Sequence, residues 1–296
     1  MLPGFVFGGN PLDIRNKVAV VTGGASGIGE AVLHRFHAEG ARHLVVVDRD
    51  EAGARRVAEA VNGTAVALDV SDESAIQTLV ATVEAEQGGI DLFFSNAGYV
   101  TIGGLEAPVD DLQKMWEVHV LAHIYAARAV LPGMIQRGEG CLLSTASAAG
   151  LLSQFGSLHY AVTKHAAVAL AEWISVTHGH QGIQVSVLCP QAVATNIGAN
   201  SPDRDKIGVD GEESGGVAGQ DGVLQAEDAA EVVMSALADG RFHILTHPEV
   251  GEYVRRKGED VDRWIGGMQR WQGSLFPPET HPANWLVAED NGRSQK

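Results

Sequence analysis

Between residues 17 and 190, short apolar runs alternate with amphipathic helical patterns, and this alternation most constrains the fold. Helical spacing occupies residues 28–41, 51–62, 71–88, 112–136 and the stretch around residue 160, and a further helix and strand follow at 226–240 and 241–247. The apolar runs are rich in Val, Ile, Leu and Phe and lie at residues 17–24, 43–48, 65–70, 90–98, 140–147 and 183–190. Strands that are apolar on both faces and joined by helices form parallel sheets. The sequence therefore predicts an α/β fold: a single domain with a doubly wound parallel sheet flanked by helices.

One of these helices carries its own start signal. Ser71 opens the predicted helix over 71–88 and is the expected N-cap, and the acidic Asp72 and Glu73 follow in the first turn. Hydroxyl caps satisfy the free N–H groups of a first turn, and acidic side chains there favour the helix dipole.

Three segments fall outside the regular alternation. Residues 1–16 form an N-terminal extension before the first strand. The segment of about 196–224 is rich in Gly, Asp and Ser, so we expect a mobile insertion or a loop over the functional site. Residues 251–296 form a C-terminal extension that contains Trp264, Trp271 and Trp285, and we expect it to pack on the domain or on a neighbouring subunit.

Composition limits the partners and the compartment. The formal net charge is −16, which argues against nucleic acids and anionic membrane surfaces as partners. Cys141 and Cys189 each lie in an apolar run, as expected for core thiols in a reducing compartment. The N-terminal segment lacks a basic stretch followed by a long apolar one, so we expect no signal peptide and a cytoplasmic protein. No Cys, His or Asp cluster has metal-ligand spacing, and we predict no catalytic metal.

A glycine-rich turn, "TGGASGIG", joins the first strand to the first helix. Gly23, Gly27 and Gly29 allow the backbone to turn tightly and to approach a pyrophosphate. The following helix presents free N–H groups and the positive end of its dipole to such an anion. This strand–turn–helix context predicts a Rossmann-type dinucleotide site.

Asp48 ends the second strand, 19 residues after Gly29. A carboxylate there can accept hydrogen bonds from both adenosine ribose hydroxyls and would repel a 2′-phosphate, which favours NAD over NADP. Two alternatives remain open at this position. Asp48 could instead cap the next helix, and the neighbouring Arg49 could bind a phosphate.

The motifs "TGxxxGxG", "NAG", a serine and "YxxxK" occur in this order, at 22–29, 96–98, 147 and 160–164. Together they resemble the classical short-chain dehydrogenase/reductase family over roughly residues 15–250. The resemblance implies a dinucleotide-binding catalytic domain over 17–250. It also implies a homodimer or homotetramer.

The resemblance assigns cofactor roles to matching positions. Asp69 and Val70 would flank the adenine, Asn96-Ala97-Gly98 would support the sheet and the cofactor ribose, and Thr195 would bond the nicotinamide carboxamide or a phosphate. Gln191 stands where the family has glycine, which puts the local backbone shape in doubt. The full set implied for the cofactor is Gly23, Ser26, Gly27, Ile28, Gly29, Asp48, Arg49, Asp69, Val70, Asn96, Ala97, Gly98, Tyr160, Lys164, Pro190, Val193 and Thr195.

Lys164 follows Tyr160 by one helical turn, so the two side chains share a face. A phenol with a pKa near 10 is a poor general base at neutral pH, but a nearby ammonium favours the phenolate and lowers that pKa. We therefore predict Tyr160 as the general acid and base of the reaction. Lys164 would also hold the nicotinamide ribose.

Ser147 lies at the family's spacing before this tyrosine, and its hydroxyl can donate to the substrate oxygen as charge develops there. Ser144 is the alternative at the end of the same strand. His119 stands where the family usually places an asparagine that helps to hold a water linked to the lysine. His119 either substitutes in that proton relay or is a packed, hydrogen-bonded core residue.

The sequence thus predicts an NAD-dependent oxidoreductase that interconverts a small hydrophobic secondary alcohol and its ketone. Leu151, Leu152, Phe155 and Tyr99 give the expected substrate side an apolar, aromatic character. Two alternatives are a 3-oxoacyl thioester reductase, which Asp48 disfavours, and a dinucleotide-binding regulator without turnover.

Overall fold

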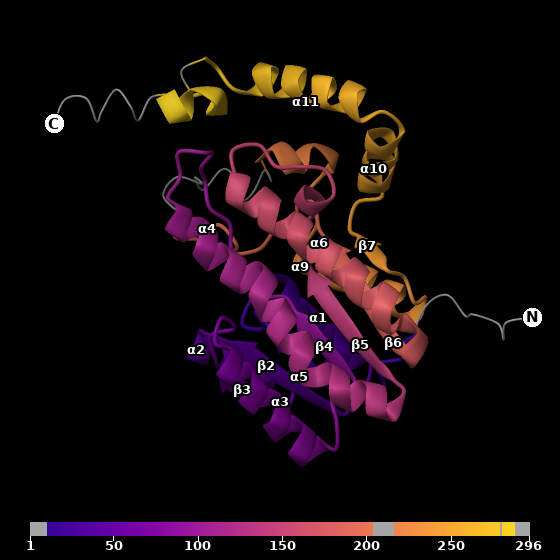
Figure 1. Cartoon of the computed structure of the whole chain (residues 1–296). Helices are drawn as coiled ribbons and strands as arrows, with labels where there is room; N and C mark the ends of the chain where they lie inside the picture. Colours follow the sequence, from indigo (N-terminus) through magenta and orange to yellow (C-terminus); the bar gives the residue numbers. More distant parts are fainter. Residues whose placement is uncertain (1–10, 204–215, 279, 288–296) are drawn as a thin grey trace, which may run out of the picture.

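Seven strands form one wholly parallel sheet at the centre of the computed structural model, in the order β3-β2-β1-β4-β5-β6-β7 (Figure 1). The structure describes residues 11–203, 216–278 and 280–287. The strands are β1 Val18–Thr22, β2 His43–Asp48, β3 Thr64–Ala67, β4 Leu92–Ser95, β5 Gly140–Thr145, β6 Ile183–Cys189 and β7 His243–Leu245. The chain runs outward from β1 to β3 and then returns to place β4 beside β1. Ligands of doubly wound sheets bind at this reversal, outside the carboxyl ends of the strands.

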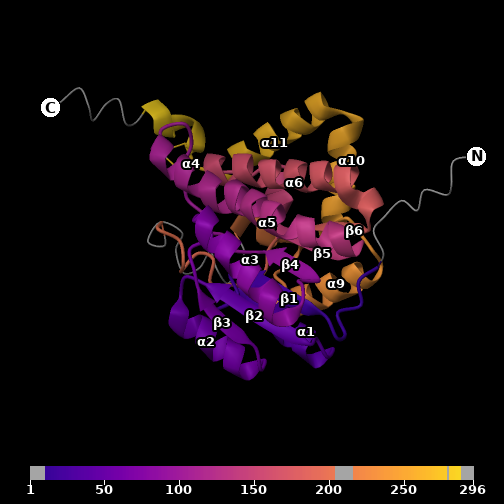
Figure 2. The ribbon, with the colours of Figure 1, turned by 60° about the horizontal axis from the view of Figure 1, so that its bottom comes forward.

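Helices cover both faces of the sheet. The helices α1 and α2 pack with α9 on one face, and α3, α5 and α6 pack on the other. Figure 2 shows the two groups on opposite sides of the strands. Their bounds are α1 Gly27–Ala38, α2 Glu51–Ala60, α3 Glu73–Gln87, α4 Val109–Trp116, α5 Ala122–Arg137, α6 Leu158–His178 and α9 Ala226–Ala238.

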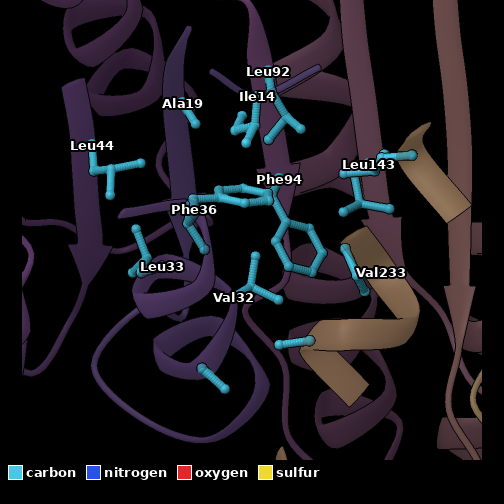
Figure 3. Close-up of a cluster of buried hydrophobic side chains, with 14 of the residues drawn as sticks. Ile14, Ala19, Val32, Leu33, Phe36, Leu44, Leu92, Phe94, Leu143 and Val233 are labelled. Carbon is cyan, nitrogen blue, oxygen red and sulfur yellow. The ribbon is translucent and has the colours of Figure 1, made fainter. Parts of the chain in front are cut away.

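The core consists of two large apolar clusters, one on each face of the sheet, and a smaller third cluster around Ile76. Figure 3 shows the first, where Phe36 of α1 meets Phe94 of β4 and Val233 comes from α9. Cys141 lies in the first cluster and Cys189 in the second, and both are buried free thiols, as predicted. Ile14 is buried in the first cluster, so residues 11–16 of the expected N-terminal extension pack on the domain.

The start of α3 corrects a sequence-based expectation. Asp72, not Ser71, is the N-cap residue, and its carboxylate accepts hydrogen bonds from the backbone N–H groups of Ser74 and Ala75 at 2.9 and 3.1 Å. Ser71 lies one residue earlier and donates its hydroxyl to Asp69 at 2.7 Å. The helix begins one residue later because the longer carboxylate reaches two N–H groups at once.

The single helix predicted over 112–136 is interrupted. A π-helical turn at Glu117–Leu121 separates α4 from α5 and places His119 at its centre. The combined stretch Val109–Arg137 is long and apolar enough to cross a membrane. However, α5 packs Ala126, Val130 and Met134 into the second core cluster, so it is a core helix of the domain.

The C-terminal extension contains two helices that the sequence patterns did not reveal. They are α10 Glu249–Glu259 and α11 Val261–Leu275, and a short turn at Pro282–Asn284 follows. In Figure 1, α11 lies across the end of the molecule toward which the β5 arrow points. The predicted loop of 196–224 lies partly outside the described residues, and its described end forms a turn at Gly216–Asp221.

Candidate active site

A groove of about 550 Å³ runs along the carboxyl ends of the central strands. It crosses the position where the strand order reverses between β1 and β4. Every residue predicted to bind the cofactor lines this groove except Gly29, which lies behind it: a Cβ there would come within 2.2 Å of the Gly23 carbonyl oxygen. The structure therefore brings together residues from seven separate segments of the chain. The lining includes Gly23, Ser26, Gly27, Ile28, Asp48, Arg49, Asp69, Val70, Asn96, Ala97, Gly98, Ser147, Tyr160, Lys164, Pro190, Gln191, Val193 and Thr195.

The glycine-rich turn has the shape of an anion cradle. Gly23 and Gly27 adopt positive φ values of 64° and 56°, which side-chain-bearing residues rarely adopt. A Cβ on Gly23 would lie 2.8 Å from the Cα of Ala97, and one on Gly27 would lie 3.2 Å from Thr195. Ser26 is the N-cap of α1, but its side chain makes no capping hydrogen bond. The first-turn N–H groups thus remain available to an anion in the groove.

Asp48 ties the end of β2 to the glycine-rich turn. Its carboxylate accepts hydrogen bonds from the backbone N–H groups of Ala25 and Asp50, at 3.1 and 3.0 Å. The alternative capping role belongs to Asp50, whose carboxylate accepts from the N–H of Gly53 at the start of α2. Asp48 lines the groove, and the Arg49 guanidinium beside it donates to the carbonyl of Asn200 at 3.4 Å.

Asn96 joins three strands beneath the groove. Its side-chain amide donates to the carbonyl of Thr22 at 3.1 Å, and its oxygen accepts from the Thr145 hydroxyl at 2.9 Å. Thr22, Asn96 and Thr145 end or follow β1, β4 and β5, which are neighbours in the sheet. The amide therefore fixes the floor on which a cofactor ribose would lie. These cradle, carboxylate and floor features fit a dinucleotide.

Ser147, Tyr160 and Lys164 meet at one end of the groove. Ser147 lies two residues after the end of β5, is buried, and donates its hydroxyl to the carbonyl of Pro190 at 3.3 Å, while Tyr160 lies in the first turn of α6. The Lys164 ammonium lies 5.5 Å from the centre of the Tyr160 ring and donates to the carbonyl of Thr145 at 2.9 Å. Ser144, the alternative serine, lies within β5.

Burial dominates the electrostatics of this group. It raises the pKa of Tyr160 above its ordinary value, although the hydrogen bond with Ser147 acts in the opposite direction. Burial also lowers the pKa of Lys164 to about 7. The expectation that Lys164 lowers the pKa of Tyr160 does not describe the protein by itself, because burial is the largest influence on both groups: it raises the pKa of the phenol and lowers the pKa of the ammonium.

His119 is fully buried between the Tyr99 and Tyr160 rings, whose centres lie 5.6 and 5.7 Å from its own. Its Nε2 accepts a hydrogen bond from the backbone N–H of Tyr99 at 3.2 Å. Its Nδ1 therefore carries the proton and donates to the Thr163 hydroxyl oxygen at 3.0 Å, while that hydroxyl donates to the carbonyl of His159. Burial, with the nearby charges of Lys164 and His123, holds the pKa of His119 well below its usual range, so the ring is neutral.

Sequence patterns did not reveal the hydrogen bonds that two residues, Thr163 and Gln191, form near the groove. Thr163 has no motif of its own; only its place between Tyr160 and Lys164 on α6 marks it. Gln191 was noted as a departure from glycine, but its contacts could not be read from the chain. Its side-chain amide donates to the carboxylate of Asp221 at 2.8 Å, and its backbone N–H donates to the Thr246 hydroxyl at 3.2 Å.

Comparison with known proteins places these features in context. The family model for short chain dehydrogenases matches residues 17–206. A 1-deoxy-11-beta-hydroxypentalenate dehydrogenase from Streptomyces exfoliatus is 33% identical over 283 residues, covering 93% of this chain and 96% of the relative. (+)-Borneol dehydrogenase 1 from Salvia officinalis is 31% identical over 239 residues, covering 78% and 90%. A short chain dehydrogenase/reductase from Burkholderia phymatum, solved in complex with NAD, has a TM-score of 0.76 at 30% identity and covers 85% of this chain and 96% of its own.

Proposed function

This chain belongs to the short-chain dehydrogenase/reductase family and is an oxidoreductase that acts on CH–OH groups with NAD(P), and we propose that it uses NAD to interconvert a hydrophobic secondary alcohol and its ketone. The meeting of Ser147, Tyr160 and Lys164 at one end of a groove that has Asp48 on its wall is the observation that carries the proposal. That arrangement supports a reacting carbinol beside Ser147 and Tyr160 and an adenosine ribose beside Asp48.

The protein's own groups handle the alcohol proton. Ser147 donates a hydrogen bond to the substrate oxygen, and Tyr160, in its phenolate form, takes the hydroxyl proton as the C–O bond becomes a carbonyl. NAD, when bound, supplies the acceptor for the carbinol hydride and a positive charge beside the phenol. In the opposite direction Tyr160 returns its proton to the carbonyl oxygen. Lys164 places a positive charge next to the phenol when its amine is protonated, and its hydrogen bond to the Thr145 carbonyl keeps it there.

His119 acts in this proposal as a positioning residue and not as a proton relay. A ring with a strongly lowered pKa does not exchange protons near neutral pH, and both of its nitrogens already have partners. Its two hydrogen bonds connect the loop after β4 to α6 through Tyr99 and Thr163. That connection fixes the first turns of α6, which carry Tyr160 and Lys164.

The preference for NAD rests on Asp48. Its carboxylate stands where it would accept from two ribose hydroxyls and would face a 2′-phosphate as a like charge. A hydrophobic substrate is supported by Tyr99, which lines the groove, and by Leu151, Leu152 and Phe155, which follow Ser147 in the chain. It is further supported by relatives that are dehydrogenases of a pentalenate and of borneol.

An absorbance assay tests the proposal. The wild-type protein receives borneol, 2-butanol or a 3-hydroxyacyl thioester, each with NAD or NADP, and formation of the reduced cofactor is followed. We expect NAD-dependent turnover of borneol, and we expect Asp48→Ala to weaken NAD use by about tenfold to a hundredfold, the value of a charged hydrogen bond. Turnover of the thioester alone, or faster turnover with NADP than with NAD, would contradict the proposal.

A further inference from the structure

The described residues of 249–287, which we call the C-terminal arm, lie at the end of the molecule toward which the β5 arrow points in Figure 1. In Figures 1 and 2, α10 and α11 lie beyond α6, away from α1 and α2. Among the arm residues that the structure describes, only Val250 is buried, and none of the core clusters includes any of them. The arm is therefore held by a few separate contacts and adds little to the stability of the sheet core.

The first contacts reach the segment between Ser147 and Tyr160. The Lys257 ammonium of α10 donates to the carbonyl oxygens of Leu151 and Leu152, at 2.7 and 3.0 Å. Trp271 of α11 packs edge-to-face on Phe155, with ring centres 5.3 Å apart. The arm thus contacts the stretch of chain that connects the two groups flanking the reacting oxygen.

A second contact involves Trp285. A Cβ on Gly104 or Gly156 would lie within 3.6 Å of the Trp285 ring, so the indole rests on both glycines. These glycines belong to two loops that are joined by hydrogen bonds from Gly103 to Gly156 at 3.0 Å and from Leu158 to Gly103 at 2.9 Å. Leu158 is the first residue of α6, so Trp285 covers the junction from which the catalytic helix starts.

A third contact links the arm to the groove itself. The Tyr253 hydroxyl of α10 donates to one carboxylate oxygen of Asp221 at 3.0 Å, and the Gln191 side chain donates to the other at 2.8 Å. Gln191 lines the groove, and Asp221 is the last residue of the turn at Gly216–Asp221, within the loop predicted over about 196–224. A glycine at 191, as in the family pattern, could not make this connection.

We propose that the C-terminal arm is the wall of the substrate side and that Trp271, packed on Phe155, determines how well a bulky apolar alcohol binds. This inference rests on the proposed function and extends it to the choice of substrate. An aromatic pair offers a large apolar surface with little rotational freedom, which suits a rigid multi-ring alcohol. We expect a small alcohol bound at Tyr160 to make no contact with Trp271. The arm's contacts with Leu151, Leu152, Gly156 and Asp221 hold it in a fixed position relative to the catalytic groups.

Steady-state kinetics with two alcohols test the proposal. The wild type, Trp271→Ala, Trp271→Phe and Ile265→Ala are each assayed with borneol and with 2-butanol at saturating NAD. We expect Trp271→Ala to raise KM for borneol about tenfold, the loss of roughly one aromatic contact. Its KM for 2-butanol, its kcat and its affinity for NAD should stay within about twofold of the wild type. Trp271→Phe should recover most of the borneol KM, and Ile265→Ala, a half-exposed position on the same helix, should resemble the wild type.

Tyr253→Phe is a second variant, which removes only the hydroxyl that donates a hydrogen bond to Asp221. We expect it to raise KM for borneol less than Trp271→Ala does, and again to leave KM for 2-butanol unchanged. Equal changes for both alcohols in Trp271→Ala, or no change, would overturn the role of the arm while leaving the proposed function intact. A lower KM for borneol in that variant would also overturn it, because Trp271 would then be an obstacle. A wild type that oxidises neither alcohol would refute the proposed function, and this inference would fall with it.

Discussion

Tyr160 and Lys164 are neighbours, with the ammonium 5.5 Å from the ring centre, and burial opposes the charged form of both groups. Loss of the lysine proton removes a positive charge and raises the pKa of the phenol, and loss of the phenol proton strengthens the ammonium. Because burial raises the pKa of Tyr160, the phenolate forms only as pH rises. Alcohol oxidation should therefore accelerate with increasing pH, and ketone reduction should slow.

Lys164→Met tests this pairing through the pH–rate profile of alcohol oxidation. Removing the positive charge raises the pKa of Tyr160 further, so the rising limb should move to higher pH. At a fixed pH below that limb, the rate should fall about tenfold for each unit of displacement. Lys164→Arg, which keeps the charge, serves as the control and should shift the limb less. Superimposable profiles for Lys164→Met and the wild type would contradict the pairing.

His119 gives a second prediction at the level of the residue. His119→Ala removes both hydrogen bonds and should lower kcat, whereas His119→Asn keeps an acceptor for the Tyr99 N–H and should recover much of the rate. Neither variant should move the pH–rate profile, because a neutral ring does not titrate in the working range. A profile displaced in both variants would instead indicate a proton relay.

The residues of the groove could be named from sequence because glycine spacing, strand ends and the Tyr160–Lys164 turn are all local patterns. The direction in which the pKa of Tyr160 shifts could not be predicted from sequence, because desolvation depends on residues distant in the chain that bury the phenol. Likewise, Asp48 and Asp50 differ in role only through the reach of each carboxylate, which sequence does not give.

At the scale of elements, apolar runs and helical spacing predicted all seven strands and the helices that cover the sheet. The π-helical turn at Glu117–Leu121 escaped prediction because α4 and α5 share one continuous apolar pattern. Such turns often occur at functional sites, and this one directs His119 toward Tyr99 and α6. Local spacing cannot report it, because its cause is a set of contacts between elements.

The N-cap of α3 provides a test at this scale. Asp72→Ala removes the carboxylate that accepts from the N–H groups of Ser74 and Ala75, and it should lower the free energy of unfolding by about 1 kcal/mol. Ser71→Ala is the matched control, because Ser71 precedes the cap and should cost much less. Urea denaturation measures both variants, and a larger loss for Ser71→Ala would contradict the assignment of the cap.

At the scale of the whole molecule, the C-terminal arm and the exposed face of α6 are the features that the alternation does not explain. The arm was invisible to sequence patterns because isolated contacts hold it, without a continuous apolar stripe buried in the core. On α6, Trp173 and Val176 are 62% and 85% exposed, although the opposite side of the same helix is core. Exposed large apolar side chains on one helix face favour an interface between subunits.

We therefore expect a homo-oligomer that uses this face of α6. Trp173→Glu combined with Val176→Glu should shift the protein toward a monomer in light scattering coupled to size-exclusion chromatography, because two charges cannot be buried unpaired in an apolar contact. A double substitution to glutamate on the exposed face of α11, at Val261 and Ile265, is the control and should leave the mass unchanged. An unchanged mass for the α6 variant would contradict this interface.

The most direct test of the whole account compares Tyr160→Phe with the wild type in NADH formation from borneol and in NAD binding by calorimetry. Phenylalanine preserves the ring packed beside His119 but cannot move a proton. The account predicts that NAD binds with nearly wild-type affinity while kcat falls about 10²- to 10⁴-fold, the contribution of a general base. A Tyr160→Phe protein that oxidises borneol at a rate close to that of the wild type would contradict it.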